Sequence, residues 1–353
     1  MLRRISAAVG SFLVDETERL RHHGDVDVTA GMLDFAVNVA GLTPPEWLRR
    51  RLANTLTTLG RYPSAAHDLD AREAVAARHG RIADEVLLLA GGAEGFAMLP
   101  RLAPTSAALI HPSFTEPDLA LREAGIPVTQ VILAPPYRLD TAAVPDDADL
   151  VVLGNPTNPT SVLHPVESIL GLRRPGRIVV VDEAFADAVP GEPETLSSFA
   201  LPDVLVLRSL TKTWSLAGLR CGYLLGPPDL LDRLRVGRAH WPLGTLQIEA
   251  IAACSEPGAV AEAAERADRI TIDREVMVAM LLDAGFDVAL PANAPFLLLR
   301  VGDGELMRKH LRENGIAVRR GDTFPGLGPD HLRVAVRGRH EVDRLITAMK
   351  EVG

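Results

Sequence analysis

Ser209-Leu210-Thr211-Lys212-Thr213-Trp214-Ser215-Leu216-Ala217-Gly218-Leu219-Arg220 follows shortly after four apolar residues, Val204-Leu205-Val206-Leu207. An apolar run of this length predicts a strand that is buried in a parallel sheet. Lys212 then lies just past the carboxyl end of that strand. Open α/β sheets bind their ligands at this edge, so the stretch predicts both a fold and a site.

The residue types in this stretch match a phosphorylated aldehyde. The amine of Lys212 can condense with a carbonyl group to give a Schiff base. Ser209, Thr211 and Arg220 supply two hydroxyls and a guanidinium, which can bind a phosphate dianion. Pyridoxal 5′-phosphate carries both groups, and we therefore expect it as the cofactor. The ordinary alternative for so short a motif is a lysine in a surface loop, and only the surrounding sequence can decide between them.

Short apolar strands alternate with helical segments on both sides of this stretch. The expected strands are residues 86–89, 107–110, 128–132, 150–153, 178–181 and 204–207. Such alternation predicts an α/β fold with a mostly parallel sheet flanked by helices. After Pro242 the pattern changes to a helical region, about residues 245–282, and then to strands near 296–299, 317–319 and 332–336. This second pattern predicts a smaller α+β domain.

The length of 353 residues favours two domains. We expect residues 1–40 to be an N-terminal segment that joins the small domain, residues 41–248 to form the large cofactor-binding domain, and residues 249–353 to form the small C-terminal domain.

Composition argues against several classes of function. A net charge of −9 disfavours wholesale nucleic-acid binding, and no apolar run approaches the length of a membrane span. The two cysteines, Cys221 and Cys254, form no paired motif and fit a reducing, cytoplasmic compartment. We expect no metal, because no Cys/His cluster has ligand spacing.

Further polar residues follow the other predicted strands. The turn at residues 91–94 places backbone N–H groups at a helix N-terminus, where anions bind. Asp182 could keep a pyridine nitrogen protonated, Asn158 could donate its amide to the O3′ oxygen of the ring, and Phe114 could stack on the ring. Each also has an ordinary interpretation as a tight turn, a helix N-cap, a turn residue or a core aromatic. Their order along the chain favours the cofactor.

With these residues in place, the chain resembles the fold-type I pyridoxal-phosphate enzymes of the histidinol-phosphate aminotransferase group. Within that group it is most similar to the threonine-phosphate decarboxylases of cobalamin biosynthesis. The resemblance covers nearly the full length and is best marked at residues 155–160, 182–185 and 209–220. It implies the fold-type I architecture.

The resemblance also implies residue roles. Lys212 and Asp182 would be catalytic: Lys212 forms the Schiff base and moves protons at the substrate carbon, and Asp182 contacts the pyridine nitrogen. The other implied cofactor contacts are Gly92, Ala93, Glu94, Phe114, Asn158, Phe185, Ser209, Thr211 and Arg220, with Tyr62 reaching the cofactor phosphate of the neighbouring subunit in a homodimer. The implied contacts to a phosphorylated amino-acid or amine substrate are His22, Asn38, Asn158, Arg319, Arg333 and Arg337.

Four features favour decarboxylation of L-threonine O-3-phosphate to (R)-1-aminopropan-2-ol O-phosphate. They are Phe185, where the aminotransferases of the group usually carry tyrosine, and the decarboxylase-like segments at residues 111–116, 323–337, and 22–25 with 34–38. Two alternatives stay open. One is an aminotransferase that acts on histidinol phosphate or a related amino acid. The other is a catalytically idle relative kept as a binding protein, and the presence of Lys212 argues against it.

Overall fold

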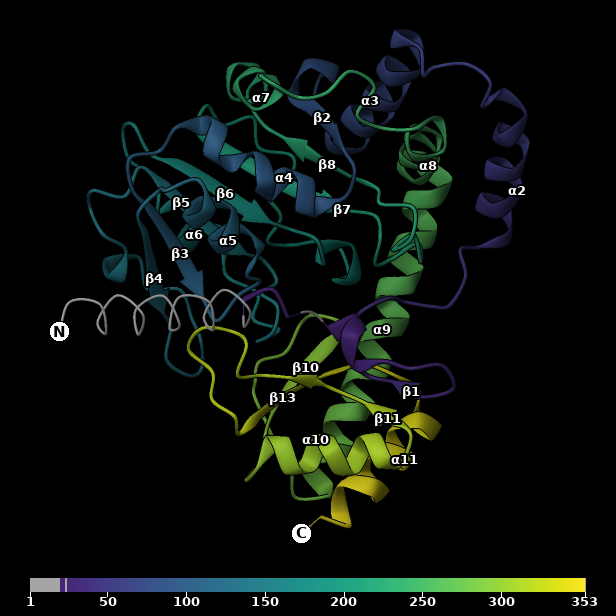
Figure 1. The fold of residues 1–353 in the computed structure, drawn as a ribbon, viewed down its shortest axis with the longest axis vertical. Coiled ribbons are helices and arrows are strands. Elements are labelled where there is room, and N and C mark those ends of the chain that lie inside the picture. Colours follow the sequence, from purple (N-terminus) through teal and green to yellow (C-terminus); the bar gives the residue numbers. More distant parts are fainter. Residues whose placement is uncertain (1–19, 23, 353) are drawn as a thin grey trace, which may run out of the picture.

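The computed structural model describes residues 20–22 and 24–352 (Figure 1). The first 19 residues of the predicted N-terminal segment therefore lie outside the described part of the chain. Within that part, no helix is both long enough and apolar enough to cross a membrane. The cytoplasmic location stays a prediction.

A seven-stranded sheet forms the larger part of the molecule, in the order β2-β8-β7-β6-β5-β3-β4. Neighbouring strands are parallel except at β8, which is antiparallel to both β2 and β7. The strands are β2 (Val86–Leu89), β3 (Ala107–His111), β4 (Val128–Ile132), β5 (Leu150–Gly154), β6 (Ile178–Asp182), β7 (Val204–Ser209) and β8 (Gly222–Leu225). The mostly parallel sheet and all six strands expected here are confirmed, and β8 was missed.

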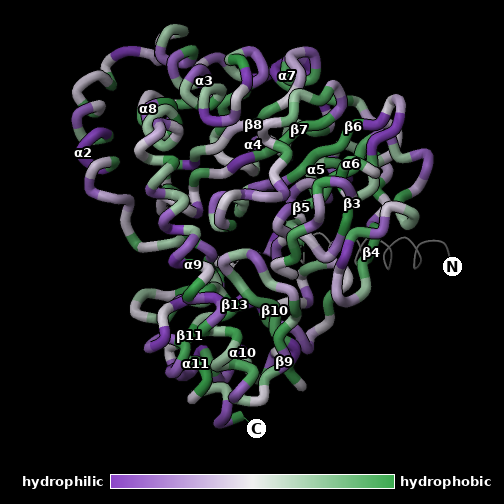
Figure 2. The backbone as a smooth tube through the Cα atoms, turned by 180° about the vertical axis from the view of Figure 1, so that it is seen from behind, coloured by the Kyte–Doolittle hydropathy of each residue, from purple (hydrophilic) through white to green (hydrophobic). Residues whose placement is uncertain are grey.

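Both faces of this sheet are buried because successive strand residues point to opposite faces. On β7, Val204 and Val206 face one core, and Leu205 and Leu207 face the other. The hydropathy colouring in Figure 2 shows the strands as mostly hydrophobic segments inside a more polar surround. The two faces are covered by α3 (Ala65–His79), α4 (Gly92–Met98), α5 (Glu116–Glu123), α6 (Val166–Leu170), α7 (Pro228–Arg235) and α8 (Thr245–Ser255), and α2 (Glu46–Thr55) packs on the outside of α8.

A second, smaller unit holds two more sheets. A four-stranded antiparallel sheet has the order β12-β13-β10-β9, and β1 pairs with β11 in parallel. The elements are β1 (Leu33–Asp34), α9 (Pro257–Asp283), β9 (Asp287–Val288), β10 (Phe296–Arg300), α10 (Gly304–Glu313), β11 (Ile316–Ala317), β12 (Arg319–Arg320), β13 (His331–Ala335) and α11 (Arg339–Lys350). Short 3-10 helices span Gly24–Asp27, Leu56–Thr58, Ala83–Glu85, Leu99–Leu102, Thr141–Ala143 and Ala186–Ala188.

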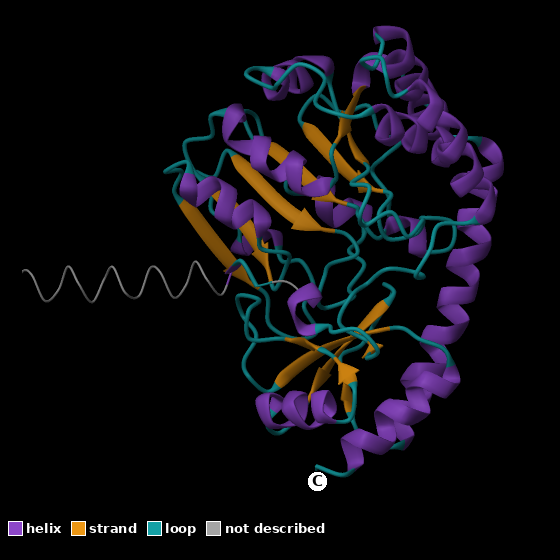
Figure 3. Cartoon of the chain, turned by 45° about the vertical axis from the view of Figure 1, so that its right-hand side comes forward, coloured by secondary structure: helices purple, strands orange, loops and turns teal. Residues whose placement is uncertain are grey.

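The long helix α9 runs from the large sheet to the small one (Figure 3). The single helical region expected at residues 245–282 is in fact two helices, because α8 ends at Ser255, Glu256 is extended, and Pro257 begins α9. A second connection forms where the backbone N–H of Asn293 donates to the Ser161 carbonyl at 2.8 Å. The pairing of β1 with β11 places the N-terminal segment against the small unit, while the boundaries at residues 40 and 248 stay a prediction.

Candidate active site

A cavity of about 420 Å³ lies between the carboxyl ends of the large sheet's strands, the N-terminal segment and the small unit. We call it the larger cavity. The predicted site residues that line it are Asn38, Ala93, Phe114, Asn158, Phe185, Lys212, Arg220, Arg319 and Arg333. The fold thus brings together side chains that are up to about 300 residues apart in the sequence.

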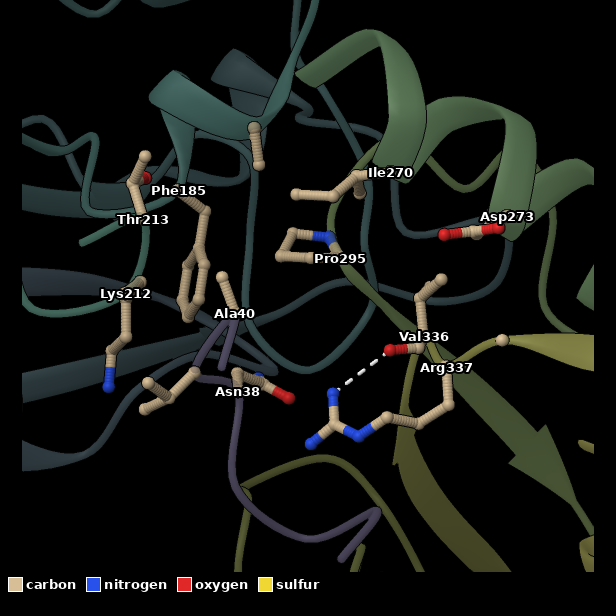
Figure 4. A pocket seen from close by; sticks show the side chains of 13 residues that line it. Asn38, Ala40, Phe185, Lys212, Thr213, Ile270, Asp273, Pro295, Val336 and Arg337 are labelled. Atoms are coloured by element: carbon tan, nitrogen blue, oxygen red, sulfur yellow. Dashed lines mark hydrogen bonds between the residues drawn. The ribbon is translucent and has the colours of Figure 1, made fainter. Parts of the chain in front are cut away.

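A smaller cavity of about 190 Å³ adjoins it, and Asn38, Phe185 and Lys212 line both. Figure 4 shows this smaller cavity, with α9 contributing Ile270 and Asp273. The Nζ atom of Lys212 lies 5.9 Å from the centre of the Phe185 ring. Lys212 and Phe185 therefore stand at the junction of the two cavities.

Asp182 ends β6, beside the strand that leads to Lys212. One of its carboxylate oxygens accepts a hydrogen bond from the Ala184 backbone N–H at 3.0 Å. Burial raises the pKa of Asp182 to about 6, and the positive charge of Lys212 opposes the shift. A charged carboxylate is thus held where a cationic partner would stabilise it.

Several groups that can bind an anion converge beside Gly91. This residue has a φ of +84°, which favours glycine, and the Arg220 guanidinium lies against the turn, with Nη2 only 2.8 Å from where a Cβ atom would stand. The hydroxyls of Ser209 and Thr211 are buried and lie 2.8 Å apart. Ser209 pairs with Gly222 across β7 and β8, and Gly222 packs against the same turn.

Arg333 connects the small unit to the larger cavity. Its Nη1 donates to Oδ1 of Asn158 at 3.0 Å and its Nη2 donates to the Ala36 carbonyl, while its Nε is buried without a hydrogen-bond partner. Because the Asn158 oxygen is occupied, the amide nitrogen is the end that can donate to a ligand. Burial, together with the nearby charge of Arg319, lowers the pKa of Arg333 to about 9. An anion in the cavity would relieve that cost.

Some predicted site residues do not line the larger cavity with their side chains. Tyr62 is 74% exposed and its ring stacks on Trp241 with centroids 4.3 Å apart. The Glu94 carboxylate accepts from the Ala90 N–H at 2.6 Å and pairs with Arg238 at 2.8 Å. Gly92 begins α4, next to Gly91. The implied cofactor contacts of these residues stay predictions.

His22 and Arg337 make contacts within the protein. Nε2 of the His22 ring lies 3.1 Å from Oδ2 of Asp27, and the His22 backbone carbonyl accepts a hydrogen bond from Nη2 of Arg319 at 2.6 Å. Arg337 lines the smaller cavity, but its Nε, Nη1 and Nη2 donate to the carbonyls of Asp34, Val336 and Val37 at 2.8, 2.9 and 2.9 Å. These contacts hold the N-terminal segment in place, and the substrate contacts proposed for both residues stay predictions.

Several residues that line the cavities were not predicted as site residues. Thr115, Glu116 and Phe324 line the larger one, and Ile270 and Asp273 line the smaller one. Glu116 carried a weak signal, since it begins a helix two residues after Phe114. Asp273 carried none, because it lies in the middle of the long helix α9.

These groups fit pyridoxal phosphate. Lys212 can bind the aldehyde, Asp182 can meet the ring nitrogen, and the groups beside Gly91 can hold the phosphate. Among residues 20–22 and 24–352, no group of three or more His, Cys, Asp or Glu side chains could hold a metal ion.

Known proteins resemble this chain in sequence and in fold. It is 60% identical over 344 residues to a histidinol-phosphate aminotransferase of Mycobacterium tuberculosis, covering 98% of this chain and 94% of that protein. It is 30% identical over 338 residues to the threonine-phosphate decarboxylase of Salmonella typhimurium, covering 91% of both. The crystal structure of the histidinol-phosphate aminotransferase from Clostridium acetobutylicum matches with a TM-score of 0.84 at 21% identity, covering 91% of this chain and 99% of that one.

These findings correct the predicted reaction. The threonine-phosphate decarboxylase prediction is wrong, because the 60% identical relative is named as an aminotransferase and the decarboxylase is a distant match. Two of the features that favoured it have structural explanations. Phe185 is buried and packs edge-on against Phe296 at 4.9 Å, and Arg337 is engaged by backbone carbonyls.

A family model described as aminotransferase class I and II matches residues 27–349. The match spans all three sheets of the described structure and every residue that lines the larger cavity except Gly24. The fold expected from the sequence, fold-type I with a mostly parallel sheet, agrees with this match. The chain therefore belongs to the class I and II aminotransferase family.

Proposed function

We propose that this enzyme transfers the amino group of histidinol phosphate to a 2-oxo acid. The observation that carries the proposal is the 60% identity, over 98% of the chain, to a protein named as a histidinol-phosphate aminotransferase. The charges of the larger cavity agree with such a substrate.

Pyridoxal phosphate is the cofactor of this family. When bound, it supplies an aldehyde that takes up the amino group and a ring that accepts the electron pair set free at the substrate carbon. The residues that would hold it are Lys212 at the aldehyde, Asp182 at the ring nitrogen, Asn158 at O3′, Phe114 at the ring face, and Ala93, Ser209, Thr211 and Arg220 at the phosphate.

Lys212 would also act as the general base that moves the proton during the reaction. Its amine stands at the junction of both cavities, where it can take the proton from the substrate carbon that carries the amino group. Asp182 would hold the proton on the ring nitrogen, since a carboxylate there favours the positively charged ring.

Arg333 and Arg319 would bind the anionic end of each substrate. Both line the larger cavity and both are buried. The positive charges of two neighbouring guanidiniums repel each other, and a phosphate dianion bound by both would relieve this repulsion. In the half-reaction with the amino acid, the same pair would bind a carboxylate.

Glu116 would recognise the imidazole. Among the described residues that line the larger cavity it is the single carboxylate, against the cations Lys212, Arg220, Arg319 and Arg333. A carboxylate accepts a hydrogen bond from an imidazole N–H and is favoured further when the ring is protonated.

The test follows glutamate formed from histidinol phosphate and 2-oxoglutarate by protein loaded with the cofactor. We expect glutamate only when both substrates are present. We expect Glu116→Gln to lower kcat/KM for histidinol phosphate about 10- to 100-fold, as loss of a charged hydrogen bond predicts, and to leave the glutamate half-reaction unchanged.

The matched control is Glu123→Gln on the same helix, where the carboxylate pairs with Arg21 on the surface at 2.5 Å. Loaded wild-type protein that forms no glutamate from histidinol phosphate would refute the proposed substrate. Equal kinetics in Glu116→Gln and wild type would refute only the role of Glu116.

A further inference from the structure

A buried cluster of charges lies next to the two strands that carry Asp182 and Lys212. Arg208 precedes Ser209 on β7 and Glu183 follows Asp182, and each is 1% exposed. Nη1 of Arg208 donates to Oε2 of Glu183 at 3.1 Å and to Oε2 of Glu192 at 2.6 Å, and Nη2 donates to Asp187. A buried arginine thus joins the end of β7 to the segment that leaves β6.

Glu183 closes this segment into a loop. Its carboxylate accepts hydrogen bonds from the Thr195 hydroxyl at 2.6 Å, the Leu196 N–H at 2.6 Å and the Ser197 hydroxyl at 2.8 Å, in addition to the bond from Arg208. The loop carries Phe185 into both cavities. The cluster therefore fixes the path of the chain on each side of the site.

The charge of Glu183 also acts on Asp182. Burial is the main cause that raises the pKa of Asp182, and the neighbouring negative charge of Glu183 raises it further. The positive charge of Arg208 balances the negative charge of Glu183, because the two side chains form a direct ion pair. Without Arg208, the Glu183 carboxylate would lose its ion pair and keep only the hydrogen bonds from Thr195, Leu196 and Ser197, one residue from the group that has to be ionised.

Other groups around the cluster do not titrate near neutral pH. On α3, Arg78 pairs with Asp187 at 2.9 Å, and the pKa of His79 is lowered to about 2 by burial and the nearby arginines. On β8, burial raises the pKa of the Tyr223 hydroxyl, which lies 2.9 Å from His79. Lys212, Glu192, Asp187 and Arg81 are further charges close to the cluster.

We propose that Arg208 is a positioning residue of this enzyme: its ion pair with Glu183 aligns the strand ends that carry Asp182 and Lys212 and keeps Asp182 ionised against the cofactor's ring nitrogen. The inference rests on the proposed role of Asp182 at that nitrogen. A buried ion pair is by itself weak evidence for stability, so the role is assigned to the site and not to the fold.

The experiment measures the affinity for pyridoxal phosphate, by quenching of protein fluorescence, between about pH 4 and pH 9, a range that extends to both sides of the Asp182 pKa of about 6. Loss of the balancing charge should make Asp182 harder to ionise. We therefore expect Arg208→Met to move the pH midpoint of cofactor affinity upward by about one unit. The double variant Arg208→Met/Glu183→Gln should move it back, because the unbalanced carboxylate is gone.

Two further variants cover the case in which Arg208→Met does not fold. Glu183→Gln alone should lower the midpoint, and Arg208→Lys, which keeps the charge, should leave it near the wild-type value. A wild-type midpoint in Arg208→Met or in Glu183→Gln would overturn the proposal, as would a shift that persists in the double variant. Wild-type protein that does not bind the cofactor would instead refute the proposed function.

Discussion

At the level of single residues, the candidate site holds buried charged groups that a bound cofactor and substrate would neutralise. Asp182 and Arg333 both have pKa values moved towards their neutral forms, first of all by burial. Such shifts cost stability in the folded protein and concentrate at functional sites. The cofactor and the substrate anion would repay that cost, which explains why these residues are tolerated in half-buried and buried positions.

Asp182→Asn should stabilise the cofactor-free protein, and the gain should grow with pH. The folded pKa of about 6 lies above the unfolded value of about 3.9. The wild-type carboxyl group therefore costs little below pH 4 and destabilises the fold increasingly as pH rises through 6. Urea unfolding should give an advantage that increases by roughly 1 kcal/mol between pH 5 and pH 7.5, toward a limit of about 3 kcal/mol.

Asparagine keeps the oxygen that accepts from Ala184, so the comparison isolates the charge. With saturating pyridoxal phosphate, the wild-type protein should become the more stable of the two, because the cofactor binds it more tightly and therefore raises its free energy of unfolding more. Identical pH dependence of the two unfolding free energies would argue against a buried, cofactor-facing carboxylate.

At the level of helices and strands, the sequence pattern was sufficient to predict those elements whose structure follows from the periodicity of their own residues. The six expected strands of the large sheet were found because their apolar runs are buried on both faces. The pattern missed β8 and β9. Strand β8 is fixed by pairing with β7 and with β2, which is far from it in the sequence, and β9 has two residues, too few to show a period. It also joined α8 to α9, since the proline between them begins a helix as readily as it ends one.

The position of the candidate site could also be predicted only where it depends on the strands. Side chains at the carboxyl ends of parallel strands must share one edge of the sheet, and this pattern predicts Asn158, Asp182 and Lys212 there. Asn158 and Lys212 line the larger cavity, and the charge of Lys212 acts on Asp182. Glu116 and Asp273 could not be found in this way, because whether a helical residue faces a cavity depends on how its helix packs. The substrate prediction failed for a related reason: Phe185 was interpreted as a reaction determinant, although packing on Phe296 explains it.

Arg337→Met should loosen the N-terminal segment and leave the cofactor site intact. Arg337 donates to three backbone carbonyls, two of them in residues 34–37, and methionine keeps an apolar stem without these donors. We expect a loss of roughly 1 to 3 kcal/mol in the free energy of unfolding. Because Asn38 and the Ala36 contact of Arg333 lie on the same segment, KM for histidinol phosphate should rise, and the visible absorption of the bound cofactor should not change.

The control is Arg339→Met, at an exposed position at the start of α11. Equal KM values for the two variants would count against a link between this segment and the substrate.

At the level of the whole molecule, the exposed apolar side chains point to a partner surface. Leu56, Leu59, Tyr62 and Trp241 are each 47 to 74% exposed, and the last two stack on each other. Exposed aromatic and aliphatic groups of this kind mark association sites in many proteins. They agree with the predicted homodimer, in which Tyr62 reaches the cofactor phosphate of the neighbouring subunit.

Sedimentation velocity should therefore find a species of twice 37.9 kDa. Tyr62→Phe should weaken cofactor affinity by about 10-fold, through loss of one hydrogen bond to a charged phosphate, without dissociating the dimer. A monomer with full cofactor affinity would contradict both the assembly and the role of Tyr62.

The most direct test of the whole account is to find the lysine that binds the cofactor. The chain contains three lysines, Lys212, Lys309 and Lys350, so the assignment is clean. Lys309 is exposed and pairs with Glu305 at 3.4 Å, and Lys350 is exposed as well. Protein incubated with pyridoxal phosphate, reduced with borohydride and digested should carry one pyridoxyl group per chain, on the peptide that contains Lys212. Modification of Lys309 or Lys350 in its place, or of no lysine at a stoichiometric level, would contradict the account.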